Sequence, residues 1–194
     1  MTTAYHRKKD PEAVREKLLS AAESLALSQG LQAVTMQAVA DAAGVTKGGF
    51  LHHFPSKEAL FQTLFAAYVR RLEAVLDRLM QQDPTPYGRF SRAYLRAALE
   101  PAIVEAASLS GGIVSAFNGD PDLRRMWYDW LTAQEQRHIE TDGAAILQIV
   151  RRAADGLWFA SQDGAVLGPG DALLPDLLAL TAPPKTQERT RGTP

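Results

Sequence analysis

Two short helical stretches joined by a tight turn at Gly44 place the strongest limit on the folds open to this chain. Thr35 precedes "MQAVADAAG", and Thr46 precedes "KGGFLHHF". A threonine just before a helix accepts a backbone N–H from the first turn, so both threonines predict helix starts. Gly44 can take the positive φ that a tight turn requires. The sequence therefore predicts a helix-turn-helix, with Ala40 where the helices cross and Phe50 as the apolar anchor of the second.

Apolar residues recur every three or four positions along most of the remaining sequence, which is the period of an α-helix. The first helix is expected over 11–29, because Asp10 can cap it, Pro11 suits its first position and Gly30 ends it. An apolar stripe over 57–82 predicts a helix about 39 Å long, at about 1.5 Å per residue. Further helices are expected near 87–99, 101–117, 121–140, 143–163 and 171–182. No segment alternates polar and apolar residues between hairpin turns, so we expect an all-α fold without a sheet.

Composition excludes several classes of protein. The 194 residues suffice for one domain with a sizeable core or a small domain joined to a larger one. The chain has no cysteine, so it can form neither a disulfide framework nor a thiolate metal site. The start "MTTAYHRKKDPE" is charged, and no segment approaches the roughly 20 apolar residues that cross a bilayer. We expect no signal peptide, no membrane partner and a cytoplasmic location.

The net charge of −1 is unevenly distributed. Residues 1–57 hold seven Lys and Arg against five Asp and Glu, a balance of +2, whereas the rest holds 14 against 17, a balance of −3. A mildly basic head on an acidic body suits a polyanion as the partner of the head.

The glycine pair inside the second short helix needs an explanation, because glycine costs about 1 kcal/mol per residue relative to alanine in a helix. The second helix of a helix-turn-helix lies in the major groove of DNA, and at Gly48 and Gly49 the backbone could approach DNA directly. A loop that needs glycine for turning alone is the alternative. A phosphate-binding Walker loop is excluded because Lys47 precedes both glycines. His52 and His53 would point about 100° apart on a helix and cannot share a metal ion, so we expect no metal and no cofactor.

The segment "TMQAVADAAGVTKGGFLHHFPSKEALF", Thr35 to Phe61, resembles the DNA-binding segment of the TetR family of bacterial transcriptional repressors. That family shows a short helix, Gly-Val, Ser/Thr-Lys-Gly, an aromatic-rich helix end and then Phe-x-Ser/Asn-Lys-Glu. The resemblance implies a helix-turn-helix DNA-binding domain at 1–55, joined by a long helix to a helical effector-binding and dimerisation domain at 56–182. The tail at 183–194, "PPKTQERTRGTP", is polar and contains proline, so we expect it to be disordered. It also implies a homodimer that binds a near-palindromic double-stranded DNA operator and leaves it when a small-molecule effector binds.

The resemblance also assigns roles to individual residues of the head. Phosphate contacts are implied for the helix-start threonines, base and backbone contacts for the start of the recognition helix, and further contacts for its histidine end and the opening lysine of the next helix. The implied DNA-binding residues are Thr35, Thr46, Lys47, Gly48, Gly49, His52, His53 and Lys57. Leu51 departs from the family, which usually has a tyrosine there whose hydroxyl reaches a phosphate. Residues 6–9, "HRKK", are either a minor-groove arm or a solvated charge run.

The stretch "AAILQIVRRAADGLWFA", 144–160, is apolar on two faces and needs two burial partners. One partner would be its own domain and the other a symmetric copy of the chain, joined by the leucine-rich "DALLPDLLAL" at 171–180. The alternative is a central helix of a monomeric core. The predicted dimer interface comprises Ile146, Ile149, Val150, Ala153, Leu157, Leu173 and Leu177.

Aromatic residues are concentrated in the body of the chain, and an aromatic cavity with a few polar groups suits a small apolar ligand. Ordinary core packing is the alternative for any one of them. The predicted pocket residues are Tyr68, Phe90, Tyr94, Phe117, Trp127, Trp130 and Trp158.

Two other functions compete with a ligand-responsive repressor. An all-helical enzyme lacks support because the histidines are scattered, and His138 with Glu135 is expected to form a surface pair. We therefore expect no catalysis. A helix-turn-helix protein controlled by a protein partner would differ from the repressor by having a fully packed body. In the repressor, a tilt of the long helix would change the separation of the two recognition helices.

Overall fold

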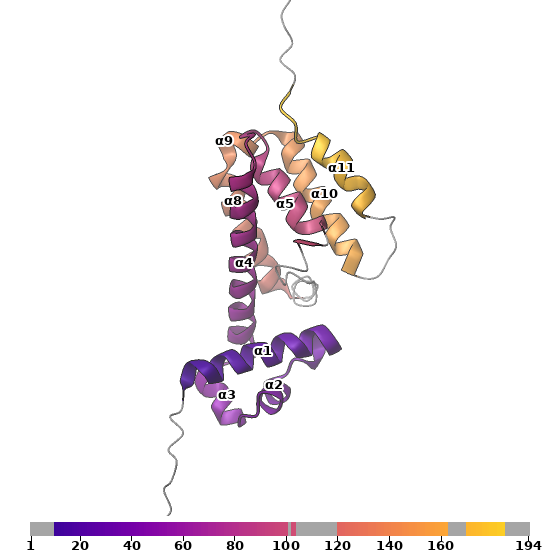
Figure 1. Cartoon of the computed structure of the whole chain (residues 1–194). Coiled ribbons are helices and arrows are strands. Elements are labelled where there is room, and N and C mark those ends of the chain that lie inside the picture. The colour runs from indigo at the N-terminus through magenta and orange to yellow at the C-terminus, as the bar shows by residue number, and fades with distance from the viewer. Residues whose placement is uncertain (1–9, 101, 104–119, 163–169, 185–194) are drawn as a thin grey trace, which may run out of the picture. The chain divides into compact units, whose positions relative to one another are not determined.

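Helices account for every regular element in the residues that the computed structural model describes, which are 10–100, 102–103, 120–162 and 170–184 (Figure 1). The predicted all-α fold is confirmed for these residues. Residues 6–9, most of the helix expected over 101–117, with Phe117, and the tail from residue 185 lie outside them. The helices are α1 (Pro11–Gln29), the 3-10 helix η1 (Leu31–Ala33), α2 (Met36–Ala43), α3 (Lys47–His53), α4 (Lys57–Gln82), α5 (Arg89–Leu99), α8 (Pro121–Arg137), α9 (Ile139–Asp142), α10 (Ala145–Gln162) and α11 (Gly170–Ala179).

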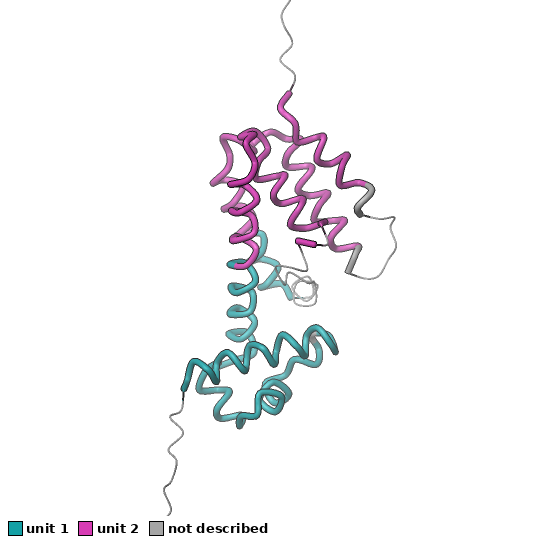
Figure 2. The backbone as a smooth tube through the Cα atoms, in the orientation of Figure 1, with its two compact units in different colours: residues 1–70, 110–128 teal, residues 71–109, 129–194 magenta. Residues whose placement is uncertain are grey.

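The chain divides into two compact units (Figure 2). Unit 1 comprises residues 1–70 and 110–128, and unit 2 comprises residues 71–109 and 129–194. The division between residues 70 and 71 falls inside α4, whereas the sequence-based division lay at residue 55. The two differ because the amino-terminal part of α4 belongs to unit 1, where it buries Leu60 and Leu64.

The helix boundaries in unit 1 follow from residues that cap them. The Asp10 carboxylate accepts the backbone N–H groups of Glu12 and Ala13, which starts α1. Gly44 ends α2 with φ of 67°, and its N–H donates to the carbonyl oxygens of Ala40 and Asp41. This left-handed residue favours glycine, since other residues are strained there. The turn predicted from the sequence is therefore present.

Unit 2 is organised around α5, which packs against α10 and α11. Gly88 precedes α5 with φ of 71°, and a Cβ atom there would lie 2.7 Å from the Thr181 carbonyl oxygen. Arg92 fixes the same corner: Nε donates to Asp83 at 2.6 Å, and Nη1 donates to the carbonyl oxygens of Tyr87 and Thr181 at 2.8 and 3.0 Å. Glycine is required here because the Thr181 carbonyl, just after α11, approaches the Gly88 backbone closely.

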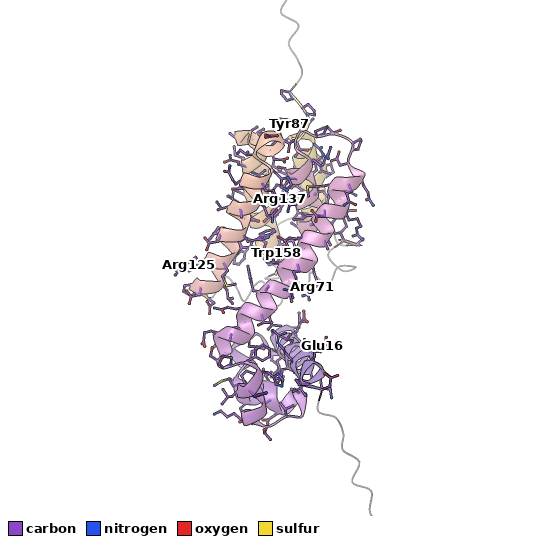
Figure 3. All side chains as sticks on the ribbon, turned by 90° about the vertical axis from the view of Figure 1, so that its left-hand side faces the viewer. Glu16, Arg71, Tyr87, Arg125, Arg137 and Trp158 are labelled. Atoms are coloured by element: carbon purple, nitrogen blue, oxygen red, sulfur yellow. The ribbon has the colours of Figure 1, made fainter. Side chains whose placement is uncertain are left out.

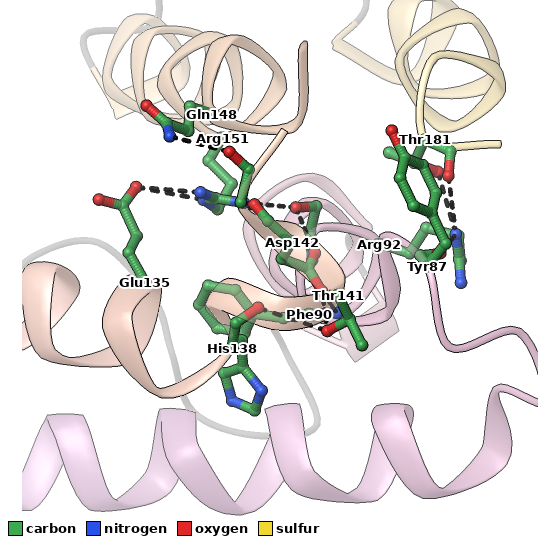
Figure 4. Close-up of polar contacts among 12 residues, drawn as sticks. Tyr87, Phe90, Arg92, Glu135, His138, Thr141, Asp142, Gln148, Arg151 and Thr181 are labelled. Atoms are coloured by element: carbon green, nitrogen blue, oxygen red, sulfur yellow. Dashed lines mark hydrogen bonds and ion pairs between the residues drawn. The ribbon is translucent and has the colours of Figure 1, made fainter. Parts of the chain in front are cut away.

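A buried polar network joins α5 to α9 and α10 (Figure 4). The Asp142 carboxylate accepts the N–H of Ser91 at 2.8 Å and of Phe90 at 3.3 Å, which caps the first turn of α5. The Ser91 hydroxyl donates to Asp142 at 2.7 Å and accepts from Nη1 of Arg151 at 2.6 Å. Arg151, only 1% exposed, also lies 3.2 Å from Glu135. Each charge in this network has a partner, which is what a buried charge requires.

Candidate functional site

The position of α3 is set by its one fully buried side chain, Phe50. Its ring lies 5.9 Å from that of Phe54, and the Arg15 guanidinium of α1 lies 5.2 Å from the centre of the Phe54 ring. With this face of α3 held in the core of unit 1, the opposite face exposes Lys47, Gly48 and His52. These three exposed residues belong to the set for which the resemblance implies DNA contact, and their role stays a prediction.

The two helix-start threonines are exposed and have the same geometry. Thr35 Oγ1 accepts the N–H of Ala38 at 3.1 Å, and Thr46 Oγ1 accepts the N–H of Gly49 at 3.0 Å. A hydroxyl that accepts one hydrogen bond still has its own hydrogen to donate. Each threonine can therefore cap its helix and donate to a phosphate oxygen at the same time.

Neither glycine of the recognition helix is required by the fold of unit 1. Positive φ values among the described glycines occur at other positions, and α3 is helical through both residues. A Cβ atom at Gly48 would meet only Thr46 Oγ1, at 3.9 Å. One at Gly49 would lie 3.4 Å from the same oxygen and 3.7 Å from Val45 Cβ. Turning alone does not explain the pair, because no turn is present there.

The end of α3 and the start of α4 carry the remaining predicted contacts. The rings of His52 and His53 lie edge to face with centroids 5.2 Å apart, and the described residues contain no group of three metal-ligating side chains. The Lys57 ammonium lies 5.0 Å from the centre of the Phe61 ring. Leu51 is 41% exposed, so it offers an apolar surface where a tyrosine would offer a hydroxyl.

The predicted pocket aromatics that the structure describes are divided between the two units. Tyr68 and Trp127 pack with centroids 6.4 Å apart in unit 1. Phe90 and Tyr94 pack 5.9 Å apart in unit 2, both fully buried on α5. Trp158 is partly buried on α10 (Figure 3). These contacts also fit core packing, so the pocket assignment stays a prediction.

Carboxylates beside these aromatics were missed by the sequence reasoning. Glu73 Oε1 accepts the Trp130 indole N–H and the Gln134 amide, both at 2.9 Å. The Tyr94 hydroxyl donates to Asp155, and burial raises the pKa of Asp155 above its ordinary 3.8, although this hydrogen bond and Arg152 oppose the rise. The sequence does contain a signal for these contacts, which is an acidic residue on the apolar side of a helix. A carboxylate that is buried there needs a hydrogen-bond partner.

Described residues of unit 2 line two cavities. A groove of about 730 Å³ runs between α5 and α11, with apolar walls that include Leu79, Leu174 and Leu178. Its arginines are already paired, Arg92 with Asp83 at 2.6 Å and Arg96 with Glu100 at 2.9 Å. A second cavity, of about 340 Å³, lies beside His138.

His138 lies in a setting that differs from the expected surface pair. Glu135 instead pairs with Arg151 at 3.2 Å and Arg152 at 3.1 Å. The His138 ring stacks on Phe90, with centroids 4.8 Å apart and planes 14° from parallel. Burial lowers the pKa of His138 below its ordinary 6.5, and nearby Arg137 lowers it further, against the opposing charges of Asp142 and Asp77.

The predicted dimer stripe separates into exposed and buried positions. Ile149 is 62% exposed on α10, Ile146 lies on the same exposed side, and Leu173 of α11 is also exposed. Ala153, Leu157 and Leu177 are partly buried. Val150 is fully buried, because it lies with Leu147 and Ala154 on the α10 face that packs inside unit 2. A partner could reach the rest of this stripe but not Val150.

Comparisons with known proteins agree with this architecture. A family described as "Bacterial regulatory proteins, tetR family" matches residues 18–64, and one described as "Tetracyclin repressor-like, C-terminal domain" matches residues 88–182. The chain is 34% identical over 139 residues to the HTH-type transcriptional repressor KstR of Mycolicibacterium smegmatis, a match that spans 64% of this chain and 68% of that protein.

Solved structures share the fold at low identity. The transcriptional regulator SCO7518 of Streptomyces coelicolor aligns with a TM-score of 0.63 at 18% identity, covering 88% of this chain and 99% of that one. The multidrug binding protein EbrR, complexed with imidazole, aligns with a TM-score of 0.65 at 16% identity, covering 90% and 98%. No helix in the described part of the chain is long and apolar enough to span a membrane. The caps and turn of unit 1, the all-helical fold and the matches to both parts of the chain together place this protein in the TetR family of bacterial transcriptional regulators.

Proposed function

We propose that this chain is a homodimeric repressor that binds a near-palindromic operator through α3 and leaves it when a small molecule binds unit 2. The observation that carries the proposal is the exposed start of α3. There Thr46 and Lys47 precede two glycines, and no contact inside unit 1 accounts for the missing side chains. A partner outside the chain that needs the backbone itself would account for them, and DNA in contact with the first turn of a recognition helix is such a partner.

Dimerisation would use the exposed side of α10 together with α11. A symmetric contact puts the same patch of both chains together, and exposed Ile149 and Leu173 suit its centre. Ile149→Glu would place two carboxylates in that contact, so it should yield monomers and lose operator binding. Leu27→Glu is the control, since Leu27 is a similarly exposed apolar residue of α1. Sedimentation velocity that shows an unchanged dimer for Ile149→Glu would contradict this interface.

The effector is a small molecule in this proposal because the KstR relative is a repressor and the structural neighbour EbrR is a multidrug binding protein with imidazole bound. Helix α4 contributes residues to both units. A ligand that favours one orientation of α4 would change the spacing of the two recognition helices and so lower operator affinity. Equal spacing in the DNA-bound and effector-bound dimers would contradict this mechanism.

Fluorescence anisotropy tests the DNA-binding step directly. The purified chain is titrated into labelled DNA from immediately upstream of its own coding region, at several salt concentrations, with scrambled DNA of equal composition as competitor. We expect saturable binding with two chains per site that scrambled DNA displaces poorly. Fragments tiled across the neighbouring genes extend the search if that region fails. Binding to every fragment no tighter than to scrambled DNA would contradict a sequence-specific repressor.

A further inference from the structure

The smaller cavity of unit 2 combines two cations, one anion and an apolar floor. Arg89, at the start of α5, and Arg137, at the end of α8, both line it, as do His138 and Asp77. Met80 of α4 and Phe90 of α5 add the apolar surface. Figure 4 shows the His138 ring over Phe90, with its nitrogens turned away from the Asp142 network. Helices α4, α5 and α8 and the residue that precedes α9 therefore bring polar groups to one small space.

Two buried nitrogen atoms at this cavity have no hydrogen-bond partner among the described residues: Nε2 of His138 and Nε of Arg89. The buried cation Arg151 of unit 2 differs from these groups, because it is paired inside the fold. Arg151 contacts Ser91 and Glu135. A buried donor without a partner is costly in a folded protein, so two beside one cavity call for an acceptor from outside the chain.

The charges at the cavity define that acceptor. The two guanidinium groups supply two positive charges, and Asp77 supplies one negative charge. The imidazole is neutral near pH 7, because burial and Arg137 lower the pKa of His138. Asp83 and Asp142 are already engaged, with Arg92 and with Ser91 respectively. One uncompensated positive charge remains, which a single negative charge would neutralise.

We propose that this cavity binds a small-molecule monocarboxylate, whose oxygens accept hydrogen bonds from Arg89, Arg137 and Nε2–H of His138. A guanidinium group is suited to a carboxylate because its planar N–H groups match the two oxygens. The apolar part of the ligand lies on Met80 and Phe90. The volume of about 340 Å³ is near the lower end of ligand pockets, about 300 to 1,000 Å³, so the ligand is compact.

Isothermal titration calorimetry of the full chain without DNA tests the site with benzoate and its neutral isostere benzamide. We expect one benzoate per chain and at least about tenfold weaker binding of benzamide, since the amide lacks the charge that the arginines bind. Arg89→Gln, Arg137→Gln and His138→Phe should each weaken benzoate binding about tenfold. His138→Phe retains a ring to stack on Phe90, so it removes the donor and not the packing.

Arg125→Gln is the matched control. Arg125 lies near the other end of α8 from Arg137 and pairs at the surface with Asp122 (Figure 3). Its affinity for benzoate should equal that of the wild type, and thermal unfolding should show that every variant is folded. Equal binding of benzoate and benzamide, no benzoate binding, or unchanged affinity in both Arg89→Gln and Arg137→Gln would overturn the proposal. Loss of binding in Lys47→Ala would also overturn it, because the anion would then occupy the DNA-binding surface.

The link to repression rests on the proposed function, but the binding site does not. Benzoate can bind in calorimetry without DNA even if the protein binds no operator. Conversely, operator binding without benzoate binding would support the repressor and place its effector at another site. If both succeed, benzoate should lower operator affinity in the wild type but not in Arg89→Gln. The two proposals therefore fail independently.

Discussion

Gly48→Ala should make the protein more stable and a weaker DNA binder. The stability gain follows from unit 1 alone: Gly48 is helical and exposed, and an added methyl group would meet only Thr46 Oγ1 at an ordinary 3.9 Å. Alanine is favoured over glycine inside a helix by up to about 1 kcal/mol, part of which comes from a less flexible unfolded chain. We expect the free energy of unfolding to rise by about 0.5 to 1 kcal/mol.

The loss of affinity follows from the proposed contact with DNA. A methyl group placed between the α3 backbone and the DNA would separate surfaces that touch, and a loss of about 1.4 kcal/mol corresponds to tenfold weaker binding. Gly48 carries no charge, so the slope of affinity against salt should stay the same. Gly48→Ala would then lower operator affinity while it raises the free energy of unfolding. A general folding defect would lower both.

Urea denaturation and operator anisotropy on the same preparation measure both effects. Gly30→Ala is the control: Gly30 ends α1 with φ of 78° and has open space around it, so alanine would be strained there. That variant should be at least about 1 kcal/mol less stable, because a φ of 78° with a ψ of 169° is essentially restricted to glycine and costs other residues about 1 to 3 kcal/mol. Its operator affinity should be unchanged. If Gly48→Ala binds the operator as tightly as the wild type, the glycine does not serve close approach to DNA.

Four further predictions use other parts of the chain. Arg151→Ala should lower the free energy of unfolding by about 3 to 5 kcal/mol, because it removes the cation that lies 4.0 Å from the buried Asp142 carboxylate. Half-exposed Arg152→Ala should cost under about 1 kcal/mol, and equal losses in urea denaturation would refute the buried network. Lys47→Ala should weaken operator binding and reduce the salt slope by about 1, and an unchanged slope would remove Lys47 from the interface. Leu51→Tyr should tighten binding by restoring a hydroxyl that can donate to a phosphate, so weaker binding would speak against a phosphate nearby. Folding raises the pKa of Asp155 above 3.8, so the folded state holds this proton more tightly and loses stability as pH rises through the folded-state pKa. Asp155→Asn should therefore be more stable than the wild type at pH 7 but not below pH 3.8. The opposite pH trend in thermal unfolding would contradict the raised pKa.

The helices of the helix-turn-helix, α2 and α3, could be predicted closely because the residues that begin and end them are local in the sequence. Thr35 and Thr46 each accept an N–H three residues further on, and Gly44 ends α2 through bonds to the preceding turn. Such caps act within one helical turn, so the residue types alone indicate where each helix begins and ends. The exposed surface of α3 could also be predicted, because burial of Phe50 leaves the opposite face of the helix exposed.

The packing of unit 2 was less predictable because its polar contacts join residues that are distant in the sequence. Asp142 caps α5 across a separation of 51 residues, and Arg151 reaches Ser91 across 60. Periodicity placed α10 correctly but did not show which apolar face would be internal, so Val150 was assigned to the partner. His138 was paired with Glu135 on helix spacing, whereas packing on Phe90 decided its position. Local pattern identifies helices, but only tertiary packing determines which of their faces meet.

Residues that break a local rule separate structural from functional positions in this chain. An arginine in the apolar stripe of α10 breaks the pattern, yet Arg151 finds Ser91 and Glu135 inside unit 2, so its exception is resolved within the fold. Gly48 breaks helix propensity without any close contact that a side chain would disturb. His138 likewise has a buried nitrogen without a partner among the described residues. Natural sequences keep such local conflicts where function requires them. Because neither the glycine nor the histidine is compensated inside its own unit, each points to a molecule outside the chain: DNA at α3, and an anion at the cavity of unit 2.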